Sequence, residues 1–587
     1  AEEQGGPGNV PDDEGFPFFA ERVQPMLVKR GCMMLGCHSP SAFHDYRLRG
    51  GSAGHFGLAA TRRNYELTLE QVALESPDPN ASRLLRKNLA VGEGGILHRG
   101  GPLFASGGDP ERCDLDAAEN GPIDEQDPYC VIVAWIARER AARMSDARPL
   151  EAFVFVRRGP ATDAELPQDF ETFRPGAEVV RIEASAEVDG TFTLGAETSL
   201  SAVCGLDPAT SDARRPAVSW DGSRVAFSAR SAADAPWRIY VVEADGSCAL
   251  EPTIAAPPVD EHGEAVPDNG ELVHDFDPAF AADGRIVFTS TRGNVMNRAA
   301  FTYDGPQRSP ADPTRLNANL YIVDGPGSGA EEPRVRQLTF LLDQELTPAF
   351  MSDGRLIFTT EKRAKGFYQL AGRRMNLDGG DYHPLFGQRS TVGHEQMTEI
   401  VELSDKNLVG IVSDRGARHG AGGLLLVNRS VGVDHLSTEP EDYLQDPGAI
   451  TWPNPLFYQR SARVLDPAAT GKLDGTEGAY RSPAPLPDGR FVVCYAPDVT
   501  DLTDFDGGFE LVVMDPETGR RSPLLSGGAG EDLLWPVAVY ARQPRKVFQS
   551  RIDEVNGATR VVPGRSDADV LFLDVPLLMS LVFQNTR

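Results

Sequence analysis

Two cysteines and a histidine near the N-terminus form the most chemically specific pattern in the chain. Cys32, Cys37 and His38 lie in the segment Cys-Met-Met-Leu-Gly-Cys-His. Two thiols followed directly by an imidazole are the attachment signature of haem c, in which the thiols add to the porphyrin and the imidazole binds the iron. Four residues separate the cysteines here, where the usual spacing is two. The pattern predicts one covalent haem c, anchored by Cys32 and Cys37, with His38 as the proximal ligand.

A sixth iron ligand has to come from the other side of the porphyrin. His98 lies in a glycine-rich loop, Gly94-Gly-Ile-Leu-His-Arg-Gly-Gly, and glycines let a backbone approach a haem face closely. We therefore expect His98 as the distal ligand, ahead of the weaker candidates Met144, His44 and His55. Two histidines would fill both axial positions and favour electron transfer, whereas an open position would favour catalysis.

The same residues allow two other interpretations. Cys32, Cys37 and His38, with or without His44, could form a zinc site. Alternatively, Cys32 and Cys37 could form a disulfide beside an unrelated histidine. Haem is favoured by the flanking sequence, where helical patterns lie on both sides of the motif.

The other five cysteines divide into two pairs and one single residue. Cys113 and Cys130 flank one loop, and Cys204 and Cys248 flank another, so we expect two disulfides. Cys494 lies in an apolar strand and is expected to be buried and inert. The chain begins Ala1-Glu-Glu-Gln, which is typical of a mature protein after removal of a signal peptide. Covalent haem and disulfides both indicate a periplasmic or extracellular location.

Length and charge exclude several classes of protein. A chain of 587 residues exceeds what one core usually supports, so two or more domains are expected. The net charge of −29 argues against nucleic acid or an anionic membrane as a partner, although it suits a basic redox partner. The most apolar late stretch, Val570–Phe583, is interrupted by Asp574 and Pro576, so no membrane span is expected.

The N-terminal region reads as a small, mostly α-helical, cytochrome c-like domain over residues 1–147. Apolar residues at helical spacing precede the motif, although Pro25 would delay or kink that helix. A closing helix is predicted after Asp127 as the cap, with Pro128 in its first turn. Its apolar face would be Val131, Ile132, Trp135 and Ile136, and a third helix is expected over 81–89.

The rest of the chain contains a repeat. Its copies begin at Pro216, Pro278, Pro348, Glu399, Pro483 and Pro536. Most copies read as strand, Asp-Gly turn and strand, and several are followed by two further strands. The fourth and sixth copies lack the Asp-Gly. This pattern predicts an all-β propeller with six blades over residues 148–565, with a tail at 566–587. Phe153 and the residues after it could supply a closing strand.

The first strand of each blade normally lines the central channel of a propeller. Six polar residues would then lie near the axis: His274, Asp275, Asp277, Glu345, His394 and Glu395. They could bind a cation or a polar ligand, or they could simply pack together as polar residues. An acidic loop could bind Ca²⁺, although its spacing does not follow the usual calcium loop: Asp501, Asp504, Asp506 and Glu510. No phosphate loop, dinucleotide fingerprint or nucleophile elbow is found.

Two resemblances follow from these residues. The Asp-Gly-Arg turns, as in Ala281-Ala-Asp-Gly-Arg-Ile-Val-Phe, resemble TolB-type propeller repeats. Phe18-Phe-Ala-Glu-Arg-Val-Gln-Pro-Met-Leu followed by Cys37-His38 resembles cytochrome domains of planctomycete-type proteins. A haem domain before a six-bladed propeller resembles the alpha subunit of hydrazine synthase and its relatives. That family carries a second haem domain, which has no matching motif in this chain, so hydrazine synthesis is not carried over.

The favoured function is electron transfer by a monohaem c-type cytochrome fused to a propeller, with a redox partner protein in a multi-subunit assembly. One alternative is a haem enzyme that acts on a small, nitrogenous substrate at an open iron site. Another is a binding or scaffold protein in which the haem is an accessory. The sequence alone leaves open whether the chain is an enzyme.

Overall fold

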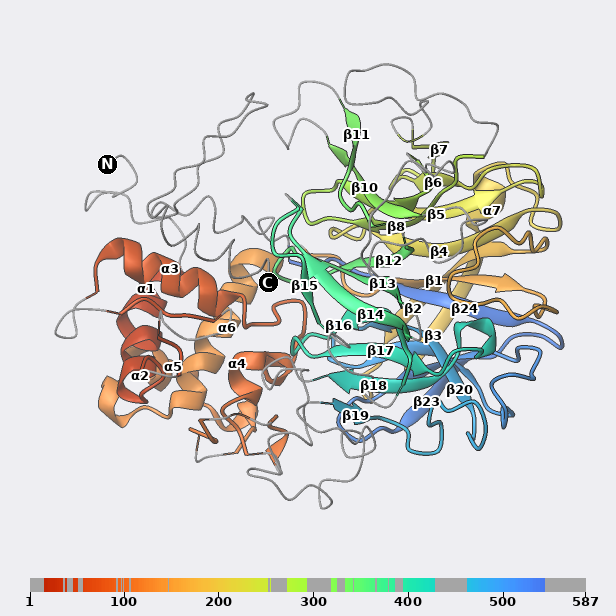
Figure 1. Ribbon diagram of the computed structural model, residues 1–587. Helices are drawn as coiled ribbons and strands as arrows, with labels where there is room; N and C mark the ends of the chain where they lie inside the picture. The colour runs from red at the N-terminus through yellow and green to blue at the C-terminus, as the bar shows by residue number, and fades with distance from the viewer. Residues whose placement is uncertain are drawn as a thin grey trace, which may run out of the picture. The chain divides into compact units, whose positions relative to one another are not determined.

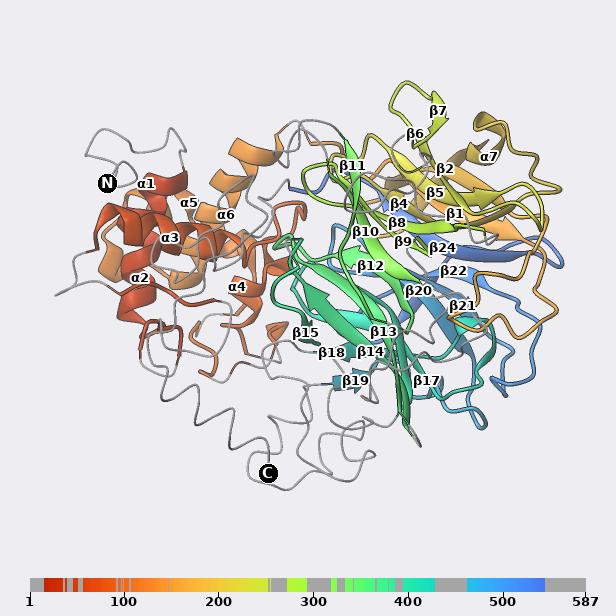
Figure 2. The same ribbon diagram turned by 45° about the horizontal axis from the view of Figure 1, so that its top comes forward.

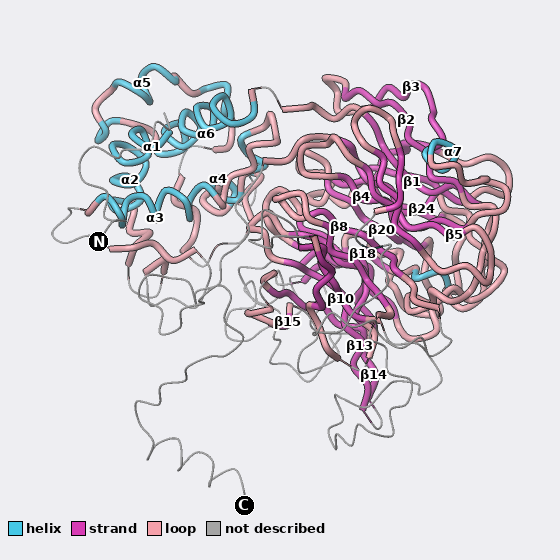
Figure 3. The backbone as a smooth tube through the Cα atoms, turned by 90° about the horizontal axis from the view of Figure 1, so that it is seen from above, coloured by secondary structure: helices cyan, strands magenta, loops and turns pink. Residues whose placement is uncertain are grey.

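The computed structural model describes a helical part followed by a strand-rich part (Figure 1). Figure 3 distinguishes the helices, in cyan, from the strands, in magenta. The predicted tail at 566–587 lies outside the described residues. These are 15–34, 37–39, 46–50, 56–90, 93–96, 98, 100–104, 107–145, 147–251, 254, 272–292, 318–324, 333–341, 343–364, 367–377, 379–385, 394–427 and 462–543.

Short helical elements surround one long helix, α6, in the first part. They are α1 (Gly15–Phe18), η1 (Phe19–Val23), α2 (Gln24–Lys29), α3 (Leu58–Leu69), η2 (Pro79–Ala81), α4 (Arg83–Arg86), η4 (Pro110–Arg112), α5 (Leu115–Asn120), η5 (Ile123–Glu125) and α6 (Pro128–Met144). The cap of α6 is confirmed, because Asp127 accepts a hydrogen bond from the Tyr129 N–H at 3.0 Å. Its expected apolar face is buried. The helix expected over 81–89 is shorter, since only α4 is α-helical there.

Pro25 does not interrupt the first helix. η1 is a π-helical turn directly before α2, so the chain stays helical from Gly15 to Lys29. Proline removes a backbone donor and crowds the preceding turn, and a π turn is one of the ways in which a helix absorbs such an irregularity. The helix therefore reaches the Cys32 loop without a break at Pro25.

A buried carboxylate ties three helices together. Glu139 of α6 is fully buried and accepts hydrogen bonds from Trp135 Nε1 (2.8 Å), Tyr65 Oη (2.9 Å) and Arg143 Nε (2.9 Å). Gly15 of α1 makes room for it, because a Cβ at that position would lie 1.7 Å from Glu139 Oε1. A carboxylate is tolerated in a core only with such partners. This network links α1 and α3 to α6.

The strands form antiparallel units of four. The first three units are β24 (Asp532–Val539), β1 (Ala152–Arg158), β2 (Glu178–Ala186) and β3 (Phe192–Ser199); β4 (Asp212–Val218), β5 (Val225–Arg230), β6 (Arg238–Val242) and β7 (Cys248–Leu250); and β8 (Asp275–Phe280), β9 (Ile286–Ser290), β10 (Asn319–Asp324) and β11 (Arg334–Gln337). The expected strands of the copies at Pro216 and Pro278, including the third and fourth strands, are present. The second strand expected in the copy at Pro536 lies outside the described residues, and β1 pairs with β24 there.

The next units continue this pattern. They are β12 (Glu345–Phe350), β13 (Leu356–Ala364), β14 (Phe367–Met375) and β15 (His383–Pro384); β16 (Gln396–Glu402), β17 (Leu408–Ser413), β18 (Gly423–Val427) and β19 (Ala462–Val464); and β20 (Ala479–Pro485), β21 (Phe491–Ala496), β22 (Glu510–Met514) and β23 (Arg521–Leu525). One parallel bridge, between Leu370 and Gln396, joins two of these units into one eight-stranded sheet. The short helix α7 (Leu200–Val203) follows β3.

The units close into a ring. The first strand of each unit contacts the first strand of the next, in the order β24, β4, β8, β12, β16 and β20, and β20 contacts β24 again. In Figure 2 the first strands from β4 to β20 run from yellow through green to blue, and β24 is also blue. Closed rings of four-stranded antiparallel sheets are β-propellers. The all-β part of the predicted fold is therefore a propeller.

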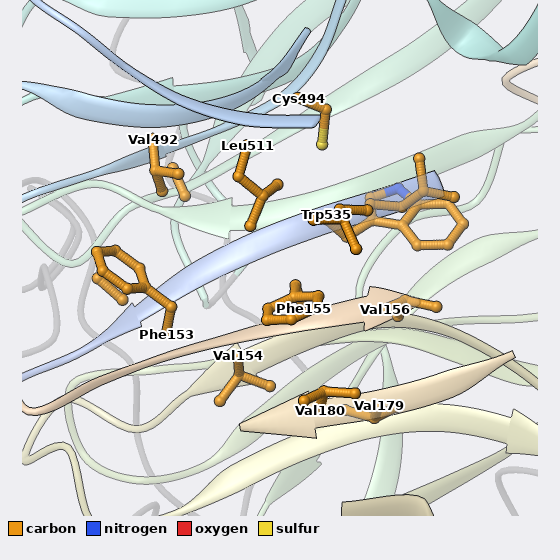
Figure 4. Packing of buried hydrophobic residues seen from close by; sticks show 14 of the residues in the cluster. Phe153, Val154, Phe155, Val156, Val179, Val180, Val492, Cys494, Leu511 and Trp535 are labelled. Atoms are coloured by element: carbon orange, nitrogen blue, oxygen red, sulfur yellow. The ribbon is translucent and has the colours of Figure 1, made fainter. Parts of the chain in front are cut away.

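The ring is closed by strands from both ends of the propeller part of the chain. β1 pairs with β24, with Phe153 opposite Ala538 and Val156 opposite Leu534. Phe153, Phe155 and Trp535 pack beside the other apolar residues of this seam (Figure 4). The expectation that Phe153 begins a closing strand is confirmed.

Both predicted disulfides are present. Cys113 bonds to Cys130 and Cys204 bonds to Cys248, with Cα–Cα distances of 5.3 Å and 5.0 Å. Cys494 is buried, and burial raises the pKa of its thiol, so the expectation of an inert thiol agrees with its surroundings.

Replacing Cys204 and Cys248 by serine is expected to lower the free energy of unfolding by about 2–4 kcal/mol, because the bond closes a long loop in the unfolded chain. Urea unfolding of the double variant measures this. Val203→Ser, at an exposed neighbouring position, is the control. Equal urea midpoints for the double variant and the wild type would show that the bond contributes nothing.

Candidate functional site

The cysteine–histidine motif forms a compact loop after α2. The Cys32 N–H donates to Leu27 O and the His38 N–H donates to Cys32 O, both at 3.0 Å. Cys32 is half-buried and Cys37 is exposed, and neither belongs to the two disulfides of the described residues. Burial, with a smaller contribution from Cys37, raises the pKa of Cys32 to about 11. The loop thus holds two thiols beside the histidine.

The structure brings His38 and His98 together, although 59 residues separate them in the sequence. The centroids of the two imidazole rings are 6.0 Å apart and the ring planes differ by 34°. A metal ion about 2 Å from one nitrogen of each ring, with the rings on opposite sides, would place the centroids about 6 Å apart. The observed separation therefore fits two histidines that bind one iron from opposite faces.

Hydrogen bonds favour the same nitrogen of each ring as the metal ligand. His38 Nδ1 lies 2.9 Å from Tyr46 O, and His98 Nδ1 lies 3.1 Å from Gly101 O. A carbonyl accepts, so Nδ1 carries the proton in each ring and the lone pair of the neutral imidazole is on Nε2. Histidine ligands of metals commonly donate their other N–H in this way.

Hydrogen bonds hold the segment around His38 against α3. The Leu48 N–H donates to His38 O at 2.7 Å, next to the Tyr46 carbonyl that holds the ring. Asn64 of α3 fixes the same segment, because its Oδ1 accepts from the Arg49 N–H at 2.6 Å and its Nδ2 donates to Arg49 O at 3.0 Å. Asn64 is fully buried. Sequence reasoning missed this residue, and an asparagine in an unremarkable polar segment gives no signal of it.

The His98 loop rests on α4. The Ile96 N–H donates to Arg86 O at 2.9 Å, and the Leu103 N–H donates to Asn88 O at 3.0 Å. Burial, followed by the charge of Lys87, lowers the pKa of His98, and the hydrogen bond to the backbone of Gly101 acts in the opposite direction. The ring is therefore neutral near pH 7, as a metal ligand must be.

The alternative sites have less support. Among the described residues, no group of three or more His, Cys, Asp or Glu side chains is arranged to hold a metal ion. His44 and His55 lie outside the described residues, so the zinc alternative with His44 is not tested. Met144 packs against the helical core. In the acidic loop, Asp504 and Asp506 face Arg418 at 3.7 Å and 3.8 Å.

The centre of the propeller contains a cavity of about 220 Å³. Each first strand of the ring contributes one residue with left-handed backbone, at a φ between 48° and 57°: Arg215, Asp277, Thr347, Glu399, Ser482 and Trp535. Strand pairing shifts register at these positions, so they are β-bulges. Of the residues expected near the axis, only Asp277 lines this cavity. His274, Asp275, Glu345, His394 and Glu395 do not line it, because the bulges turn other positions inward.

Arginines already pair with the carboxylates of this cavity. Asp277 lies 2.8 Å from Arg214 Nε and 3.4 Å from Arg215 Nε, and Arg215 also pairs with Glu399. Burial acts to raise the pKa of Glu399, but Arg215 and Arg481 hold it below its ordinary value. A cation would compete with these arginines, so the cavity does not offer the open carboxylate ring that a metal requires.

No protein-family model and no curated protein sequence matches the chain. Among solved structures, the chain is similar to hydrazine synthase from Kuenenia stuttgartiensis, with 16% identity and a TM-score of 0.45, over 69% of this chain and 48% of that one. It is also similar to TolB from Acinetobacter baumannii, with 13% identity and a TM-score of 0.37, over 72% and 74% of the two chains. The chain thus spans about half the length of the hydrazine synthase chain.

Two buried histidines make the propeller sensitive to acid. His274 Nδ1 accepts a hydrogen bond from the Trp237 N–H at 3.3 Å, and burial, with smaller contributions from nearby arginines, lowers the pKa of His274 to about 4. Burial also lowers the pKa of His394 to about 4. The unfolded chain takes up these protons near pH 6.5 and the folded chain only near pH 4. Folding stability is therefore lost as the pH falls from about 6.5 to 4.

His274→Gln keeps an acceptor for the Trp237 N–H and removes one of the two groups that take up a proton in this pH range. We expect its urea midpoint to fall less than that of the wild type between pH 7 and pH 4.5, as measured by intrinsic fluorescence. His383→Gln, at an exposed position, is the control and should follow the wild type. Parallel pH profiles for the wild type and His274→Gln would contradict the assignment.

Proposed function

We propose that the helical part is a monohaem c-type cytochrome domain and that the six four-stranded units are the blades of its propeller scaffold. The observation that supports this proposal is the pairing of His38 and His98, with ring centroids 6.0 Å apart, in the domain that carries the Cys32 and Cys37 thiols. A disulfide would not require a second histidine across from His38, and no group of three or more His, Cys, Asp or Glu side chains in the described part of the chain is arranged to hold a zinc ion. Haem attachment requires both the thiols and an axial imidazole.

Each residue of the site has a role in this proposal. Haem c supplies reversible one-electron chemistry at its iron. Cys32 and Cys37 would hold it through thioether bonds, and His38 and His98 would bind the iron through Nε2. The carbonyls of Tyr46 and Gly101 hold each imidazole in the required tautomer. Because His38 and His98 would both bind the iron, such a site would suit electron transfer rather than the binding of a substrate.

A periplasmic or extracellular setting and a redox partner complete the proposal. Both disulfides favour an oxidising compartment. No helix of the described residues is long and apolar enough to cross a membrane. The net charge of −29 suits a partner with a basic surface, and such attraction would weaken with salt. By its resemblance to the hydrazine synthase family, the chain would act within a multi-subunit redox assembly.

Covalent attachment is tested by haem staining after denaturing electrophoresis. Protein exported together with a haem-attachment system should keep its colour on the gel, because thioether bonds survive denaturation. The double variant Cys32→Ser, Cys37→Ser should lose the stain, and Cys494→Ala should keep it. A colourless wild-type band, with bound zinc found by elemental analysis, would reject the haem assignment.

The distal ligand is tested with His98→Ala. Loss of the imidazole should convert a low-spin absorption spectrum to a high-spin one and open the reduced iron to carbon monoxide. The exposed His383→Ala variant should keep the wild-type spectrum. An unchanged low-spin spectrum in His98→Ala would pass the ligand role to Met144 or to another histidine.

A further inference from the structure

The hairpin turn of the fourth repeat differs from the turns of its neighbours. The equivalent turns contain glycine in the left-handed conformation, with φ between 73° and 91°: Gly222, Gly284, Gly354 and Gly489. In the fourth repeat Lys406 takes that position with a φ of 64°. Left-handed backbone costs a non-glycine residue roughly 1–2 kcal/mol. The repeat therefore departs from its pattern at some cost in stability, which suggests that this turn has another role.

This turn is also buried. Asp405, Lys406 and Asn407 are 3%, 5% and 2% exposed. Charged residues are rarely so buried unless they are paired. By contrast, Asp283, which occupies the equivalent position in the β8–β9 turn, has a side chain that is 28% exposed and pairs with Arg285 of the same turn.

The partners of the turn come from α4 of the helical part. Arg86 Nη1 lies 2.8 Å from Asp405 Oδ2. Arg83 Nη1 donates to Asn407 Oδ1 at 2.9 Å and to Asp405 O at 2.5 Å. These are three contacts at hydrogen-bond distance, two to Asp405 and one to Asn407. They make a specific attachment of α4 to the propeller.

The same short helix supports the distal histidine. The His98 loop hydrogen bonds to the backbone of α4 at Arg86, and the Arg86 Nε donates to Gly94 O at 3.4 Å. The charges of Lys87 and Arg83 act on the His98 ring, and the charge of Asp405 acts on Lys87. Asp405 is therefore connected to His98 both through hydrogen bonds and through charge.

We propose that the Asp405 turn is the point at which the propeller controls the haem site. Asp405 is a positioning residue that holds α4, and with it the His98 loop, and its negative charge lowers the reduction potential of the iron. This inference rests on the proposed function, because it requires haem in the helical part.

The direction of the effect follows from charge. Ferric haem carries one more positive charge than ferrous haem, so a nearby negative charge stabilises the ferric state and lowers the potential. Asp405 offsets the buried cations Arg83, Arg86 and Lys87. Removing its charge leaves those cations less compensated near His98, which favours the ferrous state. Buried charges are screened less by salt than surface charges.

The test is the midpoint potential of haem-loaded Asp405→Asn, measured by spectroelectrochemical titration. Asparagine keeps the shape of the side chain and an acceptor for Arg86 but loses the charge. We expect a positive shift that persists at about 1 M salt, where surface charges are screened. Asp283→Asn removes a charge from the equivalent exposed turn and should leave the potential unchanged. A wild-type or lower potential in Asp405→Asn would overturn the electrostatic part of the proposal.

Asn407→Ala tests the positioning part without changing any charge. It removes one of the two acceptors of Arg83, so α4 and the His98 loop should open more readily and carbon monoxide should bind the reduced iron severalfold faster. A wild-type rate would overturn this part. If Asp405→Asn does not fold, Asn407→Ala still decides between positioning and no role. If the wild type carries no haem, the proposed function fails, whereas unchanged potentials and rates in haem-loaded variants reject only the role of the turn.

Discussion

The pairing of β1 with β24 is the interaction on which the propeller depends. A four-stranded sheet in a ring buries its faces against two neighbours, so an open ring would expose two apolar sheet faces at once. Here the first and last strands of the propeller share one sheet, with Val154 opposite Val537. Beyond the strands, the Ala541 N–H donates to Arg148 O at 3.0 Å, which extends the pairing toward the chain that leaves α6. Closure therefore fixes where the helical part joins the ring.

Closure also determines what the centre of the ring contains. Six first strands converge there, and each bends at a bulge that turns one residue inward. Two of these residues are carboxylates, Asp277 and Glu399, which could not be buried there without partners. Arg215 pairs with both, and the Trp535 Nε1–H donates to Glu399 Oε1 at 3.2 Å. Both central carboxylates are thus already paired, and this agrees better with a scaffold than with a metal-binding channel.

The sequence predicted the elements that local chemistry determines. Asp-Gly turns between apolar strands define hairpins, so most strands of the propeller could be located from residues such as Asp283 and Gly284. Asp127 and Pro128 define the start of α6. By contrast, α3 was not predicted, because its buried side includes Thr61 and Asn64, which look like surface residues. Their burial depends on contacts between distant segments, because both residues hydrogen bond to Gln24 of α2 and Asn64 also holds the backbone of Arg49.

The sequence predicted which residues belong to the candidate site, but it did not predict how the structure positions them. The motif itself selects Cys32, Cys37 and His38, and the glycines around His98 mark a loop that can approach another group closely. The central residues of the propeller were assigned less well, because a bulge shifts which side of a strand faces the axis. Five of the six bulge residues precede a proline, and this recurring pair was the available signal for them.

The regular turns of the repeat indicate the fold, whereas a turn that departs from the repeat indicates a contact with another part of the chain. The regular turns need only to reverse the chain, and glycine does this at the lowest cost. At the fourth repeat, Asp405 and Asn407 instead present acceptors to Arg83 and Arg86, and Lys406 takes the strained position. Local sequence rules are expected to fail where a site is served by a contact from elsewhere in the chain. The turn of the fourth repeat is such a place, because it lacks glycine and is buried against the helix that supports His98. The propeller is therefore better regarded as part of the surroundings of the His38–His98 pair than as an independent domain.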